Sequence, residues 1–150
     1  MADQLLFYNE WEPYGELCNY YVRPMGVDGM TWQAVEHYYQ AQKTLDPAMQ
    51  QRIHDAATPA DAKALGNSPE CVKRPDWDTW KLMAMRKALF CKFTQHADLR
   101  KLLLDTGDKV LHENSMVDYY WGIGEDGSGL SMLGKELMAL REELRYFADK

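Results

Sequence analysis

The sequence predicts a single α+β domain, mostly α, with about six helices and a small N-terminal antiparallel β-hairpin. The chain has 150 residues, a length that suits one domain with a hydrophobic core of its own. Short apolar segments flank an Asp-Gly pair in the first third of the chain. Farther along, apolar residues recur at three- and four-residue steps, which is the period of an amphipathic helix.

The hairpin is expected around Val27-Asp28-Gly29, with Tyr20 to Val22 and Met30 to Trp32 as its two strands. Asp-Gly between two apolar segments is a strong hairpin signal, because both central residues of the turn must adopt a positive φ. Leu5 to Tyr8 is a further short strand candidate. The sequence therefore predicts strands before residue 33 and helices after it.

Two short helices are expected at Asp46-Pro47 and Thr58-Pro59, since each pair places a capping oxygen before a proline at the first helical position. Asp61 adds an acid to the first turn of the second helix.

A long central helix should begin near Asp76, because its apolar residues cover a wide arc. They form two adjacent stripes, Leu82, Met85, Leu89 and Phe93 beside Trp77, Trp80, Ala84 and Ala88. A short helix over Ala97 to Leu104 and a last helix from about Leu130 follow. We expect Leu133, Leu137, Leu140 and Leu144 on the buried face of the last helix, and Arg141 and Arg145 on its outer face.

Charge and composition favour a small-molecule ligand. The 17 basic and 23 acidic residues give a net charge of −6, which opposes non-specific binding to nucleic acid phosphates. The basic residues in the middle of the chain are expected on a solvated helix face: Lys81, Arg86, Lys87, Lys92, Arg100 and Lys101. No apolar run approaches the ~20 residues that cross a bilayer, so we predict a cytoplasmic protein with no membrane partner.

The cysteines and histidines indicate neither a disulfide framework nor a metal site. The three cysteines are widely spaced and odd in number. The four histidines form none of the close pairs that zinc sites use. We predict no metal.

The strongest candidate for chemistry is Glu36-His37-Tyr38-Tyr39-Gln40-Ala41-Gln42-Lys43. On a helix, Glu36, Tyr39, Gln40 and Lys43 share one face. Such a face fits a concave site that holds a flat ligand and places a proton donor or acceptor against it. The alternative is an ordinary ion pair in water.

A second candidate is the irregular segment from His112 to Gly122, where Glu113 and Asp118 lie five residues apart among aromatic residues. Loss of solvation raises the pKa of a carboxyl group toward the range in which it can donate a proton. Equally, the acid could cap a nearby helix. Gly122 to Gly127 matches the dinucleotide pattern GxGxxG, but no strand-helix-strand unit surrounds it. We expect only a glycine-rich loop whose N–H groups, at the start of the last helix, could receive a phosphate.

These segments together resemble the NADAR, or YbiA-like, N-glycosidase family over nearly the whole chain. Its landmarks occur here in order as Leu17-Cys18-Asn19-Tyr20, Val27-Asp28-Gly29, Glu36 through Lys43, Trp77 through Phe93, Leu102 through Thr106, Glu113, Asp118 through Gly122, and Gly134 through Arg141. Two positions differ, since the family tends to have serine at Cys18 and asparagine at Ser131.

The resemblance implies a YbiA-like fold and hydrolysis of a C–N glycosidic bond in phosphorylated ribosylamino-pyrimidine intermediates of riboflavin biosynthesis. It also leaves open two alternatives. One is removal of ADP-ribose from guanine in modified nucleic acid, and the other is a non-catalytic module that binds a nucleotide-like ligand. An amide-to-hydroxyl change at Ser131 bears on these alternatives, because a hydroxyl cannot reproduce the two-sided hydrogen bonding of an amide.

Breaking a ribosyl C–N bond passes through a sugar cation, which calls for a carboxylate, an activated water and an acid at the leaving base. We predict Glu36, Asp118 and Lys43 as catalytic residues, with Glu36 activating water or stabilising the cation. Asp118 and Glu113 would hold ribose hydroxyls or protonate the leaving nitrogen. Lys43 would bind phosphate or attack the anomeric carbon. The predicted substrate-binding residues are Asn19, Tyr39, Trp80, Glu113, Trp121, Gly122 and Ser131. This scheme needs no cofactor.

Overall fold

The computed structural model describes residues 3–148, and within them it has six α-helices, one short 3₁₀ helix and four short strands. The predicted α+β class with about six helices and a small antiparallel hairpin is confirmed. The chain divides into two compact units, residues 19–95 and a second unit formed by the segments before and after it. Each unit is described by itself, and the single-domain prediction stays a prediction.

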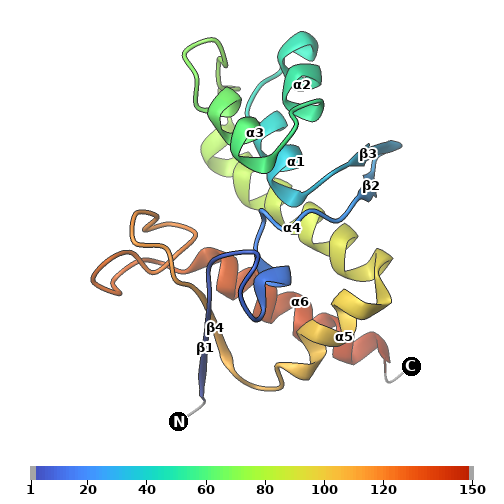
Figure 1. Cartoon of the computed structure of the whole chain (residues 1–150), viewed down its shortest axis with the longest axis vertical. Coiled ribbons are helices and arrows are strands. Elements are labelled where there is room, and N and C mark those ends of the chain that lie inside the picture. The colour runs from blue at the N-terminus through green and yellow to red at the C-terminus, as the bar shows by residue number, and fades with distance from the viewer. Residues whose placement is uncertain (1–2, 149–150) are drawn as a thin grey trace. The chain divides into compact units, whose positions relative to one another are not determined.

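The hairpin of the 19–95 unit consists of β2 (Met25–Val27) and β3 (Met30–Trp32), paired antiparallel (Figure 1). Asp28 and Gly29 have φ values of 52° and 85°, as the turn prediction required. The predicted strand at Tyr20 to Val22 is wrong. A two-residue turn pairs the residues next to it, so the first strand must run from Met25 to Val27.

Four helices complete this unit: α1 (Val35–Ala41), α2 (Pro47–His54), α3 (Pro59–Gly66) and α4 (Trp77–Gln95). Both predicted caps are present, since Asp46 accepts a hydrogen bond from the Ala48 N–H at 3.0 Å and Thr58 accepts one from the Asp61 N–H at 3.1 Å. Helix α1 packs against α2, α3 and α4. All seven of its residues are therefore buried, and α1 rather than α4 is the most enclosed helix of the unit.

The other unit contains β1 (Gln4–Phe7), the 3₁₀ helix η1 (Gly15–Leu17), α5 (Ala97–Asp105), β4 (Val110–Glu113) and α6 (Met132–Ala148). Strands β1 and β4 pair in parallel, and β4 was not predicted because four residues with only one buried side chain give no periodic signal. Helix α6 packs closely on β4, since a Cβ on Gly134 would lie 1.9 Å from the Leu111 carbonyl oxygen.

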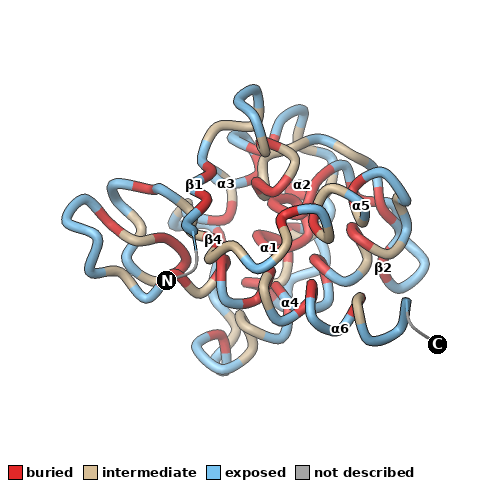
Figure 2. The backbone as a smooth tube through the Cα atoms, turned by 90° about the horizontal axis from the view of Figure 1, so that it is seen from below, coloured by how far each residue is buried: buried red, intermediate tan, exposed pale blue. Residues whose placement is uncertain are grey.

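Buried and exposed residues alternate along α4 and α6 (Figure 2). The expected leucines line the buried face of α6, namely Leu133, Leu137, Leu140 and Leu144. The prediction that the basic residues of α4 face solvent is wrong for Lys92. This side chain is buried beside the rings of Tyr21 and Phe93. Its aliphatic stem allows a lysine to take part in a core. None of the helices in the described part of the chain is long and apolar enough to span a membrane.

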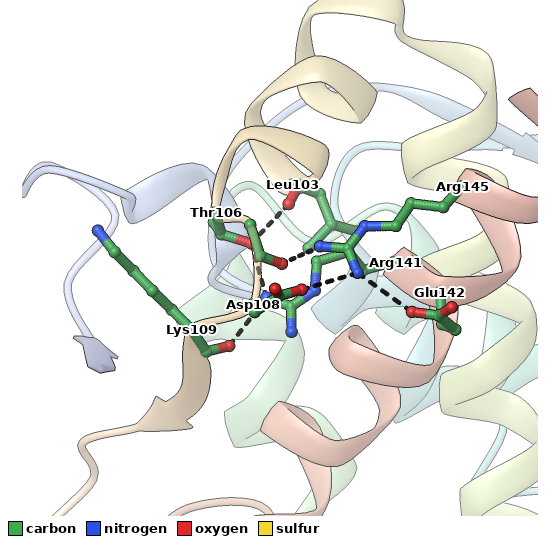
Figure 3. A network of polar contacts seen from close by, with 8 residues as sticks. Leu103, Thr106, Asp108, Lys109, Arg141, Glu142 and Arg145 are labelled. Carbon is green, nitrogen blue, oxygen red and sulfur yellow. Dashed lines mark hydrogen bonds and ion pairs between the residues drawn. The ribbon is translucent and has the colours of Figure 1, made fainter. Parts of the chain in front are cut away.

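Arg141 was expected on the outer face of α6 but is buried. Its Nη1 donates to the Thr106 Oγ1 and to the Lys109 carbonyl oxygen, both at 2.9 Å (Figure 3). Arg145, one turn later, bonds the Gly107 carbonyl and pairs with Asp108 at 3.1 Å. The two arginines thus hold the turn between α5 and β4, because carbonyl groups at a helix end need donors.

Candidate active site

The predicted polar face of α1 is a buried stripe and not a solvated ion pair. Glu36 and Lys43 are each only 7% exposed, and Gln40 is 2% exposed. The Gln40 Nε2 donates to the Glu36 Oε1 at 2.7 Å. The Lys43 Nζ donates to the Oδ1 of Asn67, just after α3, at 2.7 Å. Charged groups are rarely buried to this degree unless they are paired or hydrogen-bonded.

Burial changes the acidity of Lys43. Loss of solvation lowers its pKa to about 8, although the negative charge of Glu36 acts in the opposite direction. The ammonium group also lies 5.8 Å from the centre of the Tyr39 ring. Lys43 is therefore a cation at neutral pH, but it loses its proton as the pH rises through about 8.

Two oxygen atoms beside this stripe lack a hydrogen-bond partner among the described residues, the Gln40 Oε1 and the Asn19 Oδ1. Asn19 is tied to α1 through its carbonyl, which accepts from the Glu36 N–H at 3.1 Å. Its Nδ2 donates to the Met85 Sδ at 3.6 Å. Because buried polar atoms are almost always paired, unpaired ones mark a place for water or a ligand. Gly66 permits the approach of Gln40, since a Cβ there would lie 2.1 Å from the Oε1.

Aromatic residues lie next to the stripe. Tyr39 contacts Trp77 edge to face at a centroid distance of 5.1 Å. The Trp80 N–H donates to the Gln42 Oε1 at 3.2 Å, and the Arg74 guanidinium lies 4.4 Å from the Trp80 ring centre. One face of Trp80 is therefore already occupied by a cation.

Sequence reasoning missed Asn67 and Arg74. The Arg74 N–H donates to the Lys43 carbonyl at 2.7 Å, so both residues fix the position of Lys43. Asn67 directly follows Gly66 and is the C-cap residue of α3. This position is only a weak indication that its side chain could make a specific contact. We find no such signal for Arg74.

In the other unit, the predicted site residues lie on the loop between β4 and α6. The Asp118 Oδ1 accepts from the N–H groups of Tyr120 at 3.0 Å and Trp121 at 2.8 Å. The Ser115 Oγ accepts in turn from the Asp118 N–H at 3.1 Å. Both N–H groups belong to the loop itself, so the Oδ1 of Asp118 builds a turn and not the helix cap that the sequence left open. The catalytic role of Asp118 stays a prediction.

The remaining residues of this loop are closely packed. Trp121 is buried against Tyr120, with ring centres 4.7 Å apart. A Cβ on Gly122 would lie 3.0 Å from the Glu113 carbonyl oxygen. Ser131 is buried with a φ of 53°, and its Oγ lies 2.8 Å from the His112 Nδ1.

The expectation that the glycine-rich loop leaves free N–H groups at the start of α6 is wrong for four consecutive residues. The N–H groups of Leu130, Ser131, Met132 and Leu133 donate to the carbonyl groups of Tyr119, Gly122, Tyr120 and Trp121. Because the loop folds back on the helix start, these donors are already used.

The structure therefore brings Asn19, Glu36, Tyr39 and Lys43 together around α1, with Trp80 joined to α1 through Gln42. In the other unit it brings Glu113, at the end of β4, together with four residues of the β4–α6 loop, Asp118, Trp121, Gly122 and Ser131.

Comparisons with known proteins agree with this arrangement of motifs. Residues 6–145 match the NADAR domain. The chain belongs to the NADAR family. An N-glycosidase of Nostoc punctiforme is 46% identical over 144 residues, which cover 94% of this chain and 92% of that protein. A riboflavin biosynthesis protein of Vibrio vulnificus is 39% identical over 148 residues, covering 99% of this chain and 40% of that longer protein.

The NMR structure of the Escherichia coli protein YbiA superimposes with a TM-score of 0.92 and 41% identity, covering all of this chain and 90% of that one. The predicted family and the YbiA-like fold are thus confirmed. The prediction of an N-glycosidase agrees with the name of the Nostoc relative, and riboflavin biosynthesis is named in the Vibrio one.

Proposed function

We propose that this NADAR-family chain hydrolyses the C–N glycosidic bond of a phosphorylated ribosylamino-pyrimidine, and that Glu36 is its central catalytic group. The observation that carries the proposal is the buried Glu36–Gln40–Lys43 stripe of α1. A buried carboxylate, a buried ammonium and unpaired amide oxygens at one place are what a reaction on a polar sugar phosphate requires.

In this reaction the bond between the anomeric carbon and the base nitrogen breaks, and its electron pair leaves with the base. Positive charge develops on the ribose ring, and a water molecule then forms the new C–O bond. Glu36 stabilises the cation and accepts the proton that the water loses, while the leaving nitrogen gains a proton from an acid. The products are ribose 5-phosphate and the free base.

Gln40 and Asn19 support this chemistry. Because the Gln40 Nε2 holds the Oε1 of Glu36 at 2.7 Å, the carboxylate is fixed in orientation before substrate arrives. The unpaired Oδ1 of Asn19 is an acceptor for an N–H or an O–H of the substrate, as expected of a group that binds the edge of a base.

Lys43 binds the substrate phosphate in this proposal. At pH 7 the group is protonated, since its pKa is about 8, and an ammonium is not a nucleophile. The alternative, attack of the neutral amine on the anomeric carbon, requires that turnover increase as Lys43 loses its proton.

At the end of β4 and on the β4–α6 loop, we keep Asp118 as a catalytic residue and Glu113, Trp121, Gly122 and Ser131 as substrate-binding residues. The Oδ1 of Asp118 is used by the backbone, so any contact with a ribose hydroxyl or with the leaving nitrogen falls to its Oδ2. Trp121, or else Tyr39 or Trp80, would stack on the base.

Two substrates distinguish the candidate functions. Purified protein should release ribose 5-phosphate from a ribosylamino-pyrimidine phosphate. Release of ADP-ribose from modified guanine in a nucleic acid strand, without action on the metabolite, would instead support the alternative activity on nucleic acid. An increase in melting temperature with neither product would indicate a binding module. We place the enzyme in the cytoplasm, where such metabolites occur.

A further inference from the structure

The side of α1 opposite the Glu36 stripe borders a pocket. Glu36, Gln40 and Lys43 lie on one side of the helix, whereas Tyr38, Ala41 and Gln42 lie about half a turn away. Those three residues line a pocket of about 280 Å³ between α1, α2 and the β2–β3 hairpin. All of its lining residues belong to the 19–95 unit.

One buried polar group among the lining residues of this pocket is the indole N–H of Trp32. Trp32 is 5% exposed and lines the pocket, and its Nε1 has no acceptor within residues 3–148. The ring itself is held by edge-to-face contacts with Tyr38 at 5.5 Å and His54 at 4.8 Å. A buried indole N–H normally has a partner, so this one is positioned for a ligand.

Tyr38 supplies a second donor. Its side chain is 3% exposed and lines the same pocket. Burial, reinforced by the negative charge of Asp28, raises the pKa of the Tyr38 hydroxyl to about 12. The hydroxyl therefore keeps its proton over the whole physiological range and can donate it to an acceptor.

Two glutamines of α2 supply acceptors. The Gln50 Nε2 donates to the Thr44 carbonyl at 2.7 Å, and the Gln51 Nε2 donates to Asp55 at 2.9 Å. Since the nitrogen of each amide is used by the protein, its oxygen is the end left to accept from a ligand. Both residues line the pocket.

The charge and size of the pocket restrict the ligand further. The only ionic side chain among its lining residues is Asp28, which is paired with Lys87 at 2.6 Å, so the lining offers no unpaired cation to bind an anion and suits a neutral ligand. A volume of about 280 Å³ lies at the small end for ligand sites and suits one or two fused rings, not a dinucleotide.

We propose that this pocket is a second small-molecule site, distinct from the Glu36 stripe, for a neutral heterocycle that carries ring carbonyl and ring N–H groups, such as a pyrimidinedione. Ring carbonyls accept from Trp32 and Tyr38, and ring N–H groups donate to the amide oxygens of Gln50 and Gln51. The aromatic and aliphatic walls cover the flat faces of the ring.

Uracil is the probe that tests this site. In an NMR titration at millimolar uracil, the indole N–H resonance of Trp32, assigned with Trp32→Phe, should shift and saturate. The probe 1,3-dimethyluracil, which lacks ring N–H groups, should bind more weakly. Tyr38→Phe should weaken uracil binding roughly threefold to tenfold, the range for one hydrogen bond, whereas the matched control Tyr21→Phe, outside the pocket, should not.

Three outcomes would overturn the proposal. The Trp32 resonance could stay in place, or it could respond equally to both probes. Alternatively, only the indole resonances of Trp80 and Trp121 could shift, which would mean that uracil enters the catalytic site instead. Because the test reads the Trp32 resonance and not turnover, its result is independent of the proposed glycosidase activity.

Discussion

The two regions that carry the predicted site residues use their polar side chains in opposite ways. On α1 and just beyond its end, side chains bond to other side chains, as Gln40 does to Glu36 and Lys43 does to Asn67. Two buried oxygen atoms beside them have no partner within residues 3–148. On the β4–α6 loop, Ser115 and Asp118 accept hydrogen bonds from backbone N–H groups. The first region therefore fits our proposal of a ligand site, whereas the side chains of the second region stabilise the loop itself.

This difference shows why residue type alone does not identify a catalytic group. Glu36 and Asp118 are both acids among aromatic residues. Their hydrogen bonds separate them. An oxygen atom of Asp118 accepts from backbone N–H groups, whereas the side-chain amide of Gln40 holds the Glu36 carboxylate in place.

The largest effect is expected for Glu36→Gln. The change keeps the size of the side chain and its hydrogen bonding with Gln40 but removes the negative charge. We expect turnover to decrease by at least ~10²-fold, the usual size for loss of acid–base assistance, with substrate binding largely kept. Steady-state kinetics and calorimetric binding would measure both. Turnover at the wild-type rate would remove Glu36 from the mechanism.

The next effect concerns Lys43, whose replacement by Met should weaken binding of the phosphorylated substrate roughly tenfold to hundredfold, as for a charge-assisted hydrogen bond. Because its pKa is lowered to about 8, Lys43 loses its charge as pH rises through that value. KM should therefore increase above pH 8 in the wild type.

Lys43→Arg is the matched control for this pH dependence, since arginine stays charged and KM should then be flat between pH 7 and 9. An increase of kcat through pH 8, with KM unchanged, would instead support the neutral amine as nucleophile.

At Asp118 we expect, besides any loss of activity, a smaller effect on stability. Asp118→Ala removes the acceptor of two backbone N–H groups and should lower the free energy of unfolding by about 1–3 kcal/mol. Asp118→Asn keeps an acceptor at Oδ1 and should restore most of this loss in a denaturant titration. Equal stability of both variants and the wild type would mean that the turn does not depend on this carboxylate.

The smallest effect is expected for Ser131→Ala, which removes the hydroxyl that lies 2.8 Å from the His112 Nδ1 while the backbone keeps its positive φ. A decrease of about 1 kcal/mol in the free energy of unfolding is typical of one such bond. Because we propose that Ser131 binds substrate, KM should also increase. An unchanged KM would mean that the hydroxyl makes no substrate contact.

Local signals in the sequence predicted much of the fold. The Asp-Gly turn, the two proline-preceded caps and the leucine face of α6 all depend on neighbouring residues, and such signals are readable without a structure. Strand β4 and the buried Arg141 were missed because both depend on partners far away in the chain, β1 and the turn after α5.

For the candidate site, too, local signals were readable from the sequence and long-range contacts were not. The spacing of Glu36, Gln40 and Lys43 predicted a shared face, and their burial confirmed that this face is not a solvated one. The sequence could not show that Asn67 and Arg74 hold Lys43, because those contacts join α1 to segments whose approach is set by helix packing.

The unpaired amide oxygens of Asn19 and Gln40 offer the most direct test that the α1 stripe meets the substrate. Glu36→Gln protein should bind the intact ribosylamino-pyrimidine phosphate without turning it over, so the side-chain amide resonances of both residues can be followed by NMR in the free and bound states. Our account predicts that both shift on binding. Unchanged resonances of Asn19 and Gln40 in a saturated complex would contradict it.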